Sequence, residues 1–308
     1  MRLRMLTSVI FCFSVCLGLM YTILNLIAFD DSRLKLSFPF YVVAAVLLYI
    51  ASHLLRITRL YIIFIERKFS FLQLLKIYTI TAWVNMVIPF KIGEMFRVSE
   101  FSKLCKSFKM GFVSVWVERF FDTLLLLIFA VVLSAYTGTT HYALLIILFL
   151  FVAVTLFAFF SFPFSYRYSK QLTLSHSQSS KGLLLLEFME SLKLYYTFAK
   201  KLVRGRFPIL FGLTLLIWLL EGGVFYYVTC TLTSEYNLDE LMRVLNGVWA
   251  SSKIHGDSGM LYKIVGFGVL TIGGISALIN QIIFHFVNKR ENLLQSNNNY
   301  HIQYQFRK

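Results

Sequence analysis

Ionisable side chains interrupt the apolar stretches of this chain at positions where a charge is costly. They form three groups and one isolated acid: His53, Arg56 and Arg59; Lys91, Glu94 and Arg97; Glu118, Arg119 and Asp122; and Glu221. An unpaired charge of this kind costs about 2.5 to 3.5 kcal/mol at the centre of a membrane. We therefore expect these side chains to face inward and to pair with one another or to contact water.

The spacing within the groups favours pairing on shared helical faces. Glu94 and Arg97 lie three residues apart, as do Arg119 and Asp122, and Glu118 lies four residues before Asp122; residues at these spacings are neighbours on a helix. Without the histidine, the set has five basic and four acidic members, so full pairing leaves one positive charge. That surplus suits an anionic group such as a phosphate, which the planar fork of an arginine binds well.

Pro89 and Gly93 predict a helix break beside the second group of charges. A break inside a membrane frees backbone N–H and C=O groups, which are tolerated there only when they are buried in protein or line a wet cavity. A helix that restarts near Gly93 directs its positive N-terminal end toward that cavity. Broken helices of this type are typical of binding sites in transporters.

Structural interpretations of the same residues stay open. The 118–122 segment is compatible with a salt bridge that only locks two helices, and Arg56 and Arg59 are compatible with snorkelling to the membrane interface. Glu221, which Gly222 and Gly223 follow, fits a small-residue packing notch as well as a functional acid. The sequence has no Walker loop, no His-Glu-x-x-His, no Gly-x-Ser-x-Gly and no metal-ligand cluster. We predict no catalytic residue, no metal and no cofactor.

The elements that carry these residues are predicted to be membrane helices. The chain has 308 residues, of which 58% are hydrophobic and only 15% charged, whereas about a quarter of the residues of a soluble domain are charged. Apolar runs long enough to cross a membrane are expected at residues 5–29, 38–65, 111–135, 141–162, 207–232 and 260–287. The predicted fold class is all-α: a polytopic helical membrane protein with about six spans and a re-entrant broken helix at 69–109.

Basic residues set the expected orientation. A formal charge of +15 would suggest nucleic acid in a soluble protein, but here the basic residues flank the spans, and cytoplasmic loops are enriched in lysine and arginine. We predict no nucleic-acid partner. All the basic loops lie on one side only if 69–109 enters and leaves by the same face. The predicted location is the plasma (inner) membrane, with both termini cytoplasmic.

The predicted domain organisation is one transmembrane domain at residues 1–287 and a polar cytoplasmic tail at 288–308. Between the fourth and fifth spans we expect a Ser-rich loop at 165–181. An amphipathic helix at 183–206 follows, in which apolar residues recur at helical spacing. It is interpreted either as a helix on the membrane surface or as an extension of the next span.

Two linked motifs resemble a known family. The matching positions are Asn85, Pro89, Gly93, Glu94, Arg97, Glu118, Arg119 and Asp122. They resemble the flippase-like membrane domain of the lysylphosphatidylglycerol synthases, as found in stand-alone members without the aminoacyl-transferase domain. Lys91 replaces the family's usual arginine and Phe90 its usual glycine. The motif resemblance covers roughly residues 45–130.

The resemblance and the charge cluster together favour a non-enzymatic protein that binds an anionic lipid or a polyprenyl-linked glycolipid and moves it between leaflets. The residues expected to bind the head group are Lys91, Arg97, Arg119, Arg56 and Arg59, with the last two at the cytoplasmic mouth. The residues expected to position them are Asn85, Pro89, Gly93, Glu94, Glu118 and Asp122. The alternatives are a membrane glycosyl or head-group transferase with Glu118 or Asp122 as a base, and an accessory subunit that partners lipid- or polysaccharide-assembly proteins.

Overall fold

The computed structural model describes residue 20 and residues 38–67, 69–87, 92–137, 142–176, 180–232, 264–266 and 268–270. Among these residues every element is a helix: α2 (Phe38–Ile63), the short 3₁₀ helix η2 (Ile65–Arg67), α3 (Phe71–Val87), α4 (Ile92–Cys105), α5 (Phe108–Thr137), α6 (Tyr142–His176), α7 (Ser180–Val203) and α8 (Phe207–Leu232). The predicted all-α membrane fold is confirmed. Most of the predicted first and last spans, the tail at 288–308, Pro89 and Lys91 lie outside the described residues.

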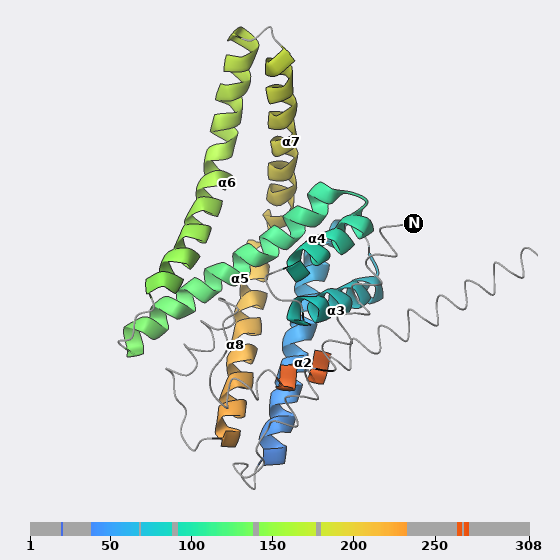
Figure 1. Ribbon diagram of the computed structural model, residues 1–308, viewed down its shortest axis with the longest axis vertical. Helices are drawn as coiled ribbons and strands as arrows, with labels where there is room; N and C mark the ends of the chain where they lie inside the picture. The colour runs from blue at the N-terminus through green and yellow to red at the C-terminus, as the bar shows by residue number, and fades with distance from the viewer. Residues whose placement is uncertain are drawn as a thin grey trace, which may run out of the picture.

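Three of the described helices are long and apolar enough to cross a membrane. They contain the stretches Phe40–Ile63, Tyr142–Ser175 and Phe207–Val228, which correspond to the predicted spans 38–65, 141–162 and 207–232. The predicted span 111–135 lies within α5. Helices α2 and α8 run side by side along most of their length (Figure 1), and Ala45 and Tyr49 of α2 pack with Val224 and Val228 of α8 in a shared core.

Helices α3 and α4 form the predicted hairpin, interrupted between Val87 and Ile92. Its two outer ends lie close together, because η2 leads into α3, α4 leads into α5, and the Arg67 guanidinium lies 3.0 Å from the sulfur of Met110. Helices α3 and α4 cross closely: a Cβ built on Gly93 would lie 2.3 Å from the Asn85 Cα. Only glycine fits at this crossing, and the tight contact brings the first turn of α4 against the last part of α3.

Helices α6 and α7 form a second, longer hairpin that extends away from α2 and α8 (Figure 1). Residues 165–176 continue α6, so the predicted loop at 165–181 is wrong for most of its length. The helix persists because its polar face has partners on α7: Glu190 accepts hydrogen bonds from Tyr166 and Lys170. These bonds hold the pKa of the Glu190 carboxyl at about 2, well below its usual range.

A turn at Gly205, whose φ is +74°, separates α7 from α8. Helix α7 stands alongside α6 and leads into α8 (Figure 1). This arrangement favours the interpretation of 183–206 as an extension of the next span over that of a separate surface helix.

Candidate functional site

The polar centre of the molecule is built on one face of α5. Glu118 and Asp122 lie one turn apart there, and both contact Arg59 of α2: its Nη2 is 2.8 Å from Glu118 Oε1, and its Nη1 is 2.6 Å from Asp122 Oδ1. Nη1 also donates to the hydroxyl of Thr214 on α8, at 3.0 Å. The Arg59 side chain is only 1% exposed. A single buried guanidinium therefore links three helices.

Arg97 brings α4 into the same network. Its Nη2 lies 2.6 Å from Glu118 Oε2, so each oxygen of Glu118 accepts from a different arginine. The Arg97 guanidinium also lies 5.6 Å from the ring centroids of both Tyr78 and Phe101, a range in which the negative face of an aromatic ring attracts a cation. We call Arg59, Arg97 and Glu118 the closed core, because all three are buried.

Arg119 and Glu94 form the accessible end of the network. They pair across α5 and α4 at 3.1 Å, and Arg119 also lies 3.6 Å from Asp122 Oδ2. The Arg119 side chain is 34% exposed and that of Glu94 20%. We call this pair the open end. Its charges are joined by longer contacts than those in the closed core, and they can be reached from outside.

A second polar cluster lies between α2 and α8. The Arg56 Nη2 is 3.1 Å from Glu221 Oε1, and the same oxygen accepts a hydrogen bond from Ser52 at 2.8 Å. Next to them on α2, His53 Nδ1 lies 2.8 Å from the hydroxyl of Tyr78 on α3. Tyr78 thus contacts both His53 and Arg97, and it connects this cluster with the closed core.

The charges of the two clusters balance. Arg56, Arg59, Arg97 and Arg119 face four carboxylates, those of Glu94, Glu118, Asp122 and Glu221. Such pairing offsets the large desolvation cost of burying ions, whereas removal of one partner leaves a buried charge uncompensated. The sequence also predicted Lys91 as a fifth cation of this set, and Lys91 lies outside the described residues.

The chain as a whole was compared with known proteins. The sequence model of the family described as the lysylphosphatidylglycerol synthase TM region matches residues 5–252. The chain belongs to this family. The match includes α2 to α8, and so every helix that contributes to the network. No curated protein and no solved structure matches the chain. As a member of the lysylphosphatidylglycerol synthase TM region family with long apolar helices, the chain is an integral membrane protein.

The structure brings the predicted charges together, but in a different pairing. Arg119 pairs with Asp122 on its own helix, as its spacing suggested. Glu94 and Arg97 instead pair across helices, with Arg119 and Glu118 respectively. The reason is that α4 packs against α5 and offers each side chain an opposite charge on the facing helix.

Two further predictions need correction. Arg59 does not lie at a mouth and does not snorkel, because it is buried between two carboxylates. Glu221 is not an isolated acid, because Arg56 and Ser52 contact it. The signal for this second cluster was present in the sequence: Ser52, Arg56 and Arg59 recur at helical spacing and form a polar stripe on α2.

Sequence reasoning also missed Tyr78 and Thr214, which carry no charge and gave no pattern. Asn85, predicted to position the site, lies against Gly93 at the hairpin crossing.

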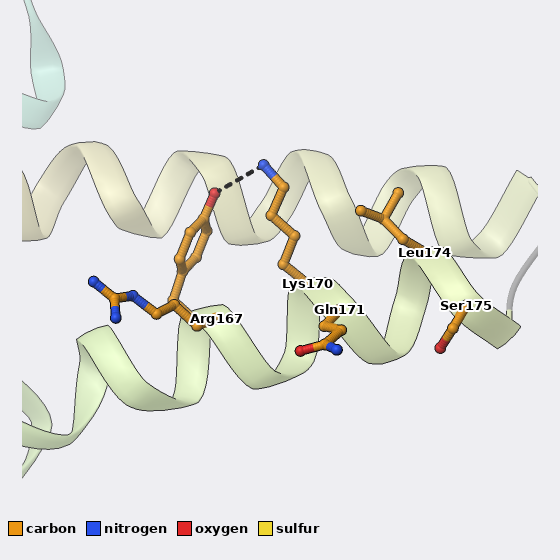
Figure 2. Close-up of a pocket in the computed structure, with 6 residues that line it drawn as sticks. Arg167, Lys170, Gln171, Leu174 and Ser175 are labelled. Carbon is orange, nitrogen blue, oxygen red and sulfur yellow. Dashed lines mark hydrogen bonds between the residues drawn. The ribbon is translucent and has the colours of Figure 1, made fainter.

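A separate hollow lies along the polar part of α6. It is an open groove lined by Tyr166, Arg167, Lys170, Gln171, Leu174 and Ser175, and none of the predicted site residues contributes to it (Figure 2). Lys170 lies 3.4 Å from the Tyr166 hydroxyl and contacts Glu190 of α7. Arg167 has no hydrogen-bond or ion-pair partner among the described residues, and it offers a matched control for the arginines of the network.

Proposed function

We propose that this protein binds an anionic membrane lipid, or a polyprenyl-phosphate-linked glycolipid, through its charge network and moves it between the two leaflets. The observation that carries the proposal is the contrast between the buried ion pairs of the closed core and the accessible pair Arg119 and Glu94 at the open end. The family to which the chain belongs is named for a lipid-synthesising enzyme. Charges buried within membrane proteins are rare and typically mark substrate or ion pathways.

The open end has unused hydrogen-bonding capacity. The Arg119 Nε and the Glu94 Oε2 are buried and have no partner in the described part of the chain, and unsatisfied buried polar atoms call for an explanation such as a ligand or a water. A lipid phosphate would accept from Arg119 through a charge-assisted bond. Lys91, which precedes α4 in the sequence, is the further cation that we assign to the head group.

The closed core has a positioning role in this proposal. Arg59 uses its terminal nitrogens on Glu118 and Asp122, and Arg97 uses one on Glu118. Asp122 in turn lies 3.6 Å from Arg119 at the open end. A head group that entered the closed core would have to break short, buried ion pairs, which is costly. We therefore assign direct contact with the lipid to Arg119 and Lys91, and indirect roles to Arg59 and Arg97.

The arrangement gives little support to the transferase alternative. A general base must lie within hydrogen-bond reach of its substrate, but Glu118 is buried with an arginine on each oxygen, and Asp122 is shared between Arg59 and Arg119. We place the protein in the plasma (inner) membrane with both termini in the cytoplasm. The gathering of Arg67, Lys109 and Arg206 at the end where α2 meets α5 and α8 supports this orientation.

The test uses purified protein in phosphatidylcholine vesicles that contain fluorescent phosphatidylglycerol or a fluorescent polyprenyl phosphate, with a membrane-impermeant quencher added outside. The wild-type protein should accelerate quenching of the inner-leaflet probe. Arg119→Gln should lower the rate by roughly 10- to 150-fold, since a hydrogen bond to a charged group is worth about 1.5 to 3 kcal/mol. Arg167→Gln should leave the rate unchanged. The proposal would be refuted if neither probe crossed the bilayer faster in vesicles that contain the wild-type protein than in vesicles without protein.

A further inference from the structure

The second polar cluster repeats the construction of the open end. In both places a partly exposed arginine lies 3.1 Å from a carboxylate: Arg119 from Glu94 and Arg56 from Glu221. The Arg56 side chain is 24% exposed and that of Glu221 10%. Arg59 and Arg97, by contrast, are almost fully buried and pair at 2.6 to 2.8 Å. Arg56 and Arg119 are therefore the two network arginines that an outside ligand can reach among the described residues.

Arg56 can leave its carboxylate at a lower cost than the arginines of the closed core. Ser52 donates to the same Glu221 oxygen that Arg56 contacts, so the carboxylate keeps a hydrogen bond when the guanidinium turns toward another anion. The Arg56 Nε is buried and has no partner within the described residues. The guanidinium thus has donors that an incoming oxygen could use, and burial strengthens such a bond.

Arg56 lies beyond the closed core on α2, as seen from Arg67. It lies one helical turn from Arg59 on α2, on the side away from Arg67, and Arg59 is joined through Asp122 to Arg119. Eleven residues separate Arg56 from Arg67, which at about 1.5 Å per helical residue is roughly 16 Å. With Arg67 at the cytoplasmic interface, as in the proposed orientation, Arg56 lies at about half of the roughly 30 Å thickness of the hydrocarbon core. An ionisable side chain at this depth is costly and is typical of a functional site.

We infer that Arg56, held by Glu221 and Ser52, is a second and deeper binding position for a phosphate-bearing lipid head group, to which the head group passes after it has bound at Arg119. The inference rests on the proposed function and adds a second step to it. Arg56 contacts the head group, whereas Glu221 and Ser52 are positioning residues that hold Arg56 while the position is empty.

The test separates binding from movement. Arg56→Gln, Arg56→Lys and Arg119→Gln are reconstituted in phosphatidylcholine vesicles with fluorescent phosphatidylglycerol, and both the affinity for this lipid in detergent and its transbilayer rate are measured. Arg56→Gln should keep the affinity within about twofold but lower the rate by about tenfold, and Arg56→Lys should restore much of the rate because it restores the charge. Arg119→Gln should lower both quantities, and Arg167→Gln neither.

Folding is controlled separately. Arg56→Gln leaves Glu221 without its cation, so the double variant Arg56→Gln/Glu221→Gln, which removes both charges, is measured beside it; it should fold as the wild type does and show the same slow movement. An Arg56→Gln protein, or a folded double variant, that moves the lipid at the wild-type rate overturns the second position while the proposed function stands. A wild-type protein that does not move the lipid overturns both.

Discussion

At the scale of single residues, the stability of the charge network depends on which arginine pairs with each carboxylate. Glu118 accepts from two arginines that come from different helices, and Asp122 is shared between a buried and an exposed one. Arg59 has the most demanding position, because it is almost completely buried and contacts Glu118, Asp122 and Thr214 together. Its removal would leave Glu118 with Arg97 alone and Asp122 with only the longer contact to Arg119.

We therefore expect Arg59→Met to destabilise the folded protein by about 3 to 5 kcal/mol, the usual cost of removing one partner of a buried ion pair. Unfolding in mixed micelles with increasing denaturing detergent measures this change. Arg119→Met is the matched control, and its smaller loss follows from its exposure. Equal stabilities of the two variants would contradict the division into a closed core and an open end.

At the scale of elements, the network depends on two close helix crossings. Gly93 lets α4 cross α3 at Asn85, and Gly111 lets α5 cross α4 at Ser102, where an added Cβ would lie 2.6 Å from a backbone nitrogen. These two crossings set how far Glu94 and Arg97 of α4 lie from the acidic face of α5. A small shift at either crossing would lengthen contacts that now measure 2.6 to 3.1 Å.

Gly93→Ala is expected to lower stability by about 1 to 3 kcal/mol, as overpacking of a tight contact does. It should also slow lipid movement, because the obstacle is the Asn85 backbone, which cannot rotate away. Gly222→Ala in α8 is the control, since its added Cβ meets nothing within 4 Å. Thermal unfolding of both variants in detergent measures the difference, and a Gly93→Ala protein as stable as Gly222→Ala would show that the crossing is not tight.

At the scale of the whole molecule, the hairpin of α3 and α4 decides how the later helices are oriented. Because both of its ends attach where Arg67 contacts Met110, α5 starts close to the point where α2 finishes. The basic segments around Arg67, Lys109 and Arg206 then share that end. If α3 and α4 had instead crossed the membrane once as a single span, every later helix would be inverted.

Cysteine labelling tests this arrangement in a background in which the native cysteines are replaced by serine. Lys106→Cys, at the exposed turn between α4 and α5, should react with a membrane-impermeant maleimide only after the cells are permeabilised. Asp30→Cys lies between the predicted spans 5–29 and 38–65; with a cytoplasmic N-terminus this segment faces the opposite side, so the cysteine should react in intact cells. Labelling of Lys106→Cys in intact cells would contradict the cytoplasmic placement of the basic loops.

The sequence by itself determined the class of the protein and the location of its polar residues. Apolar runs as long as a membrane is thick admit few structures besides helices, since each backbone polar group must be satisfied within its own segment. Pro89 and Gly93 predicted that one helix would end and another begin there, because proline removes a backbone donor and glycine is conformationally permissive. The cost of unpaired charge predicted that the arginines and carboxylates would meet.

Only the tertiary structure decided which charges pair and which remain accessible. Spacing along one helix identifies neighbours on that helix, and so it found the Arg119–Asp122 contact but not the pairing of Arg97 with Glu118 or of Arg56 with Glu221. Those pairs join residues far apart in the chain, and their geometry depends on how α2, α4, α5 and α8 pack. Because a guanidinium pairs with whichever carboxylate packing brings within reach, the separation of a closed core from an open end is a property of the assembled helices.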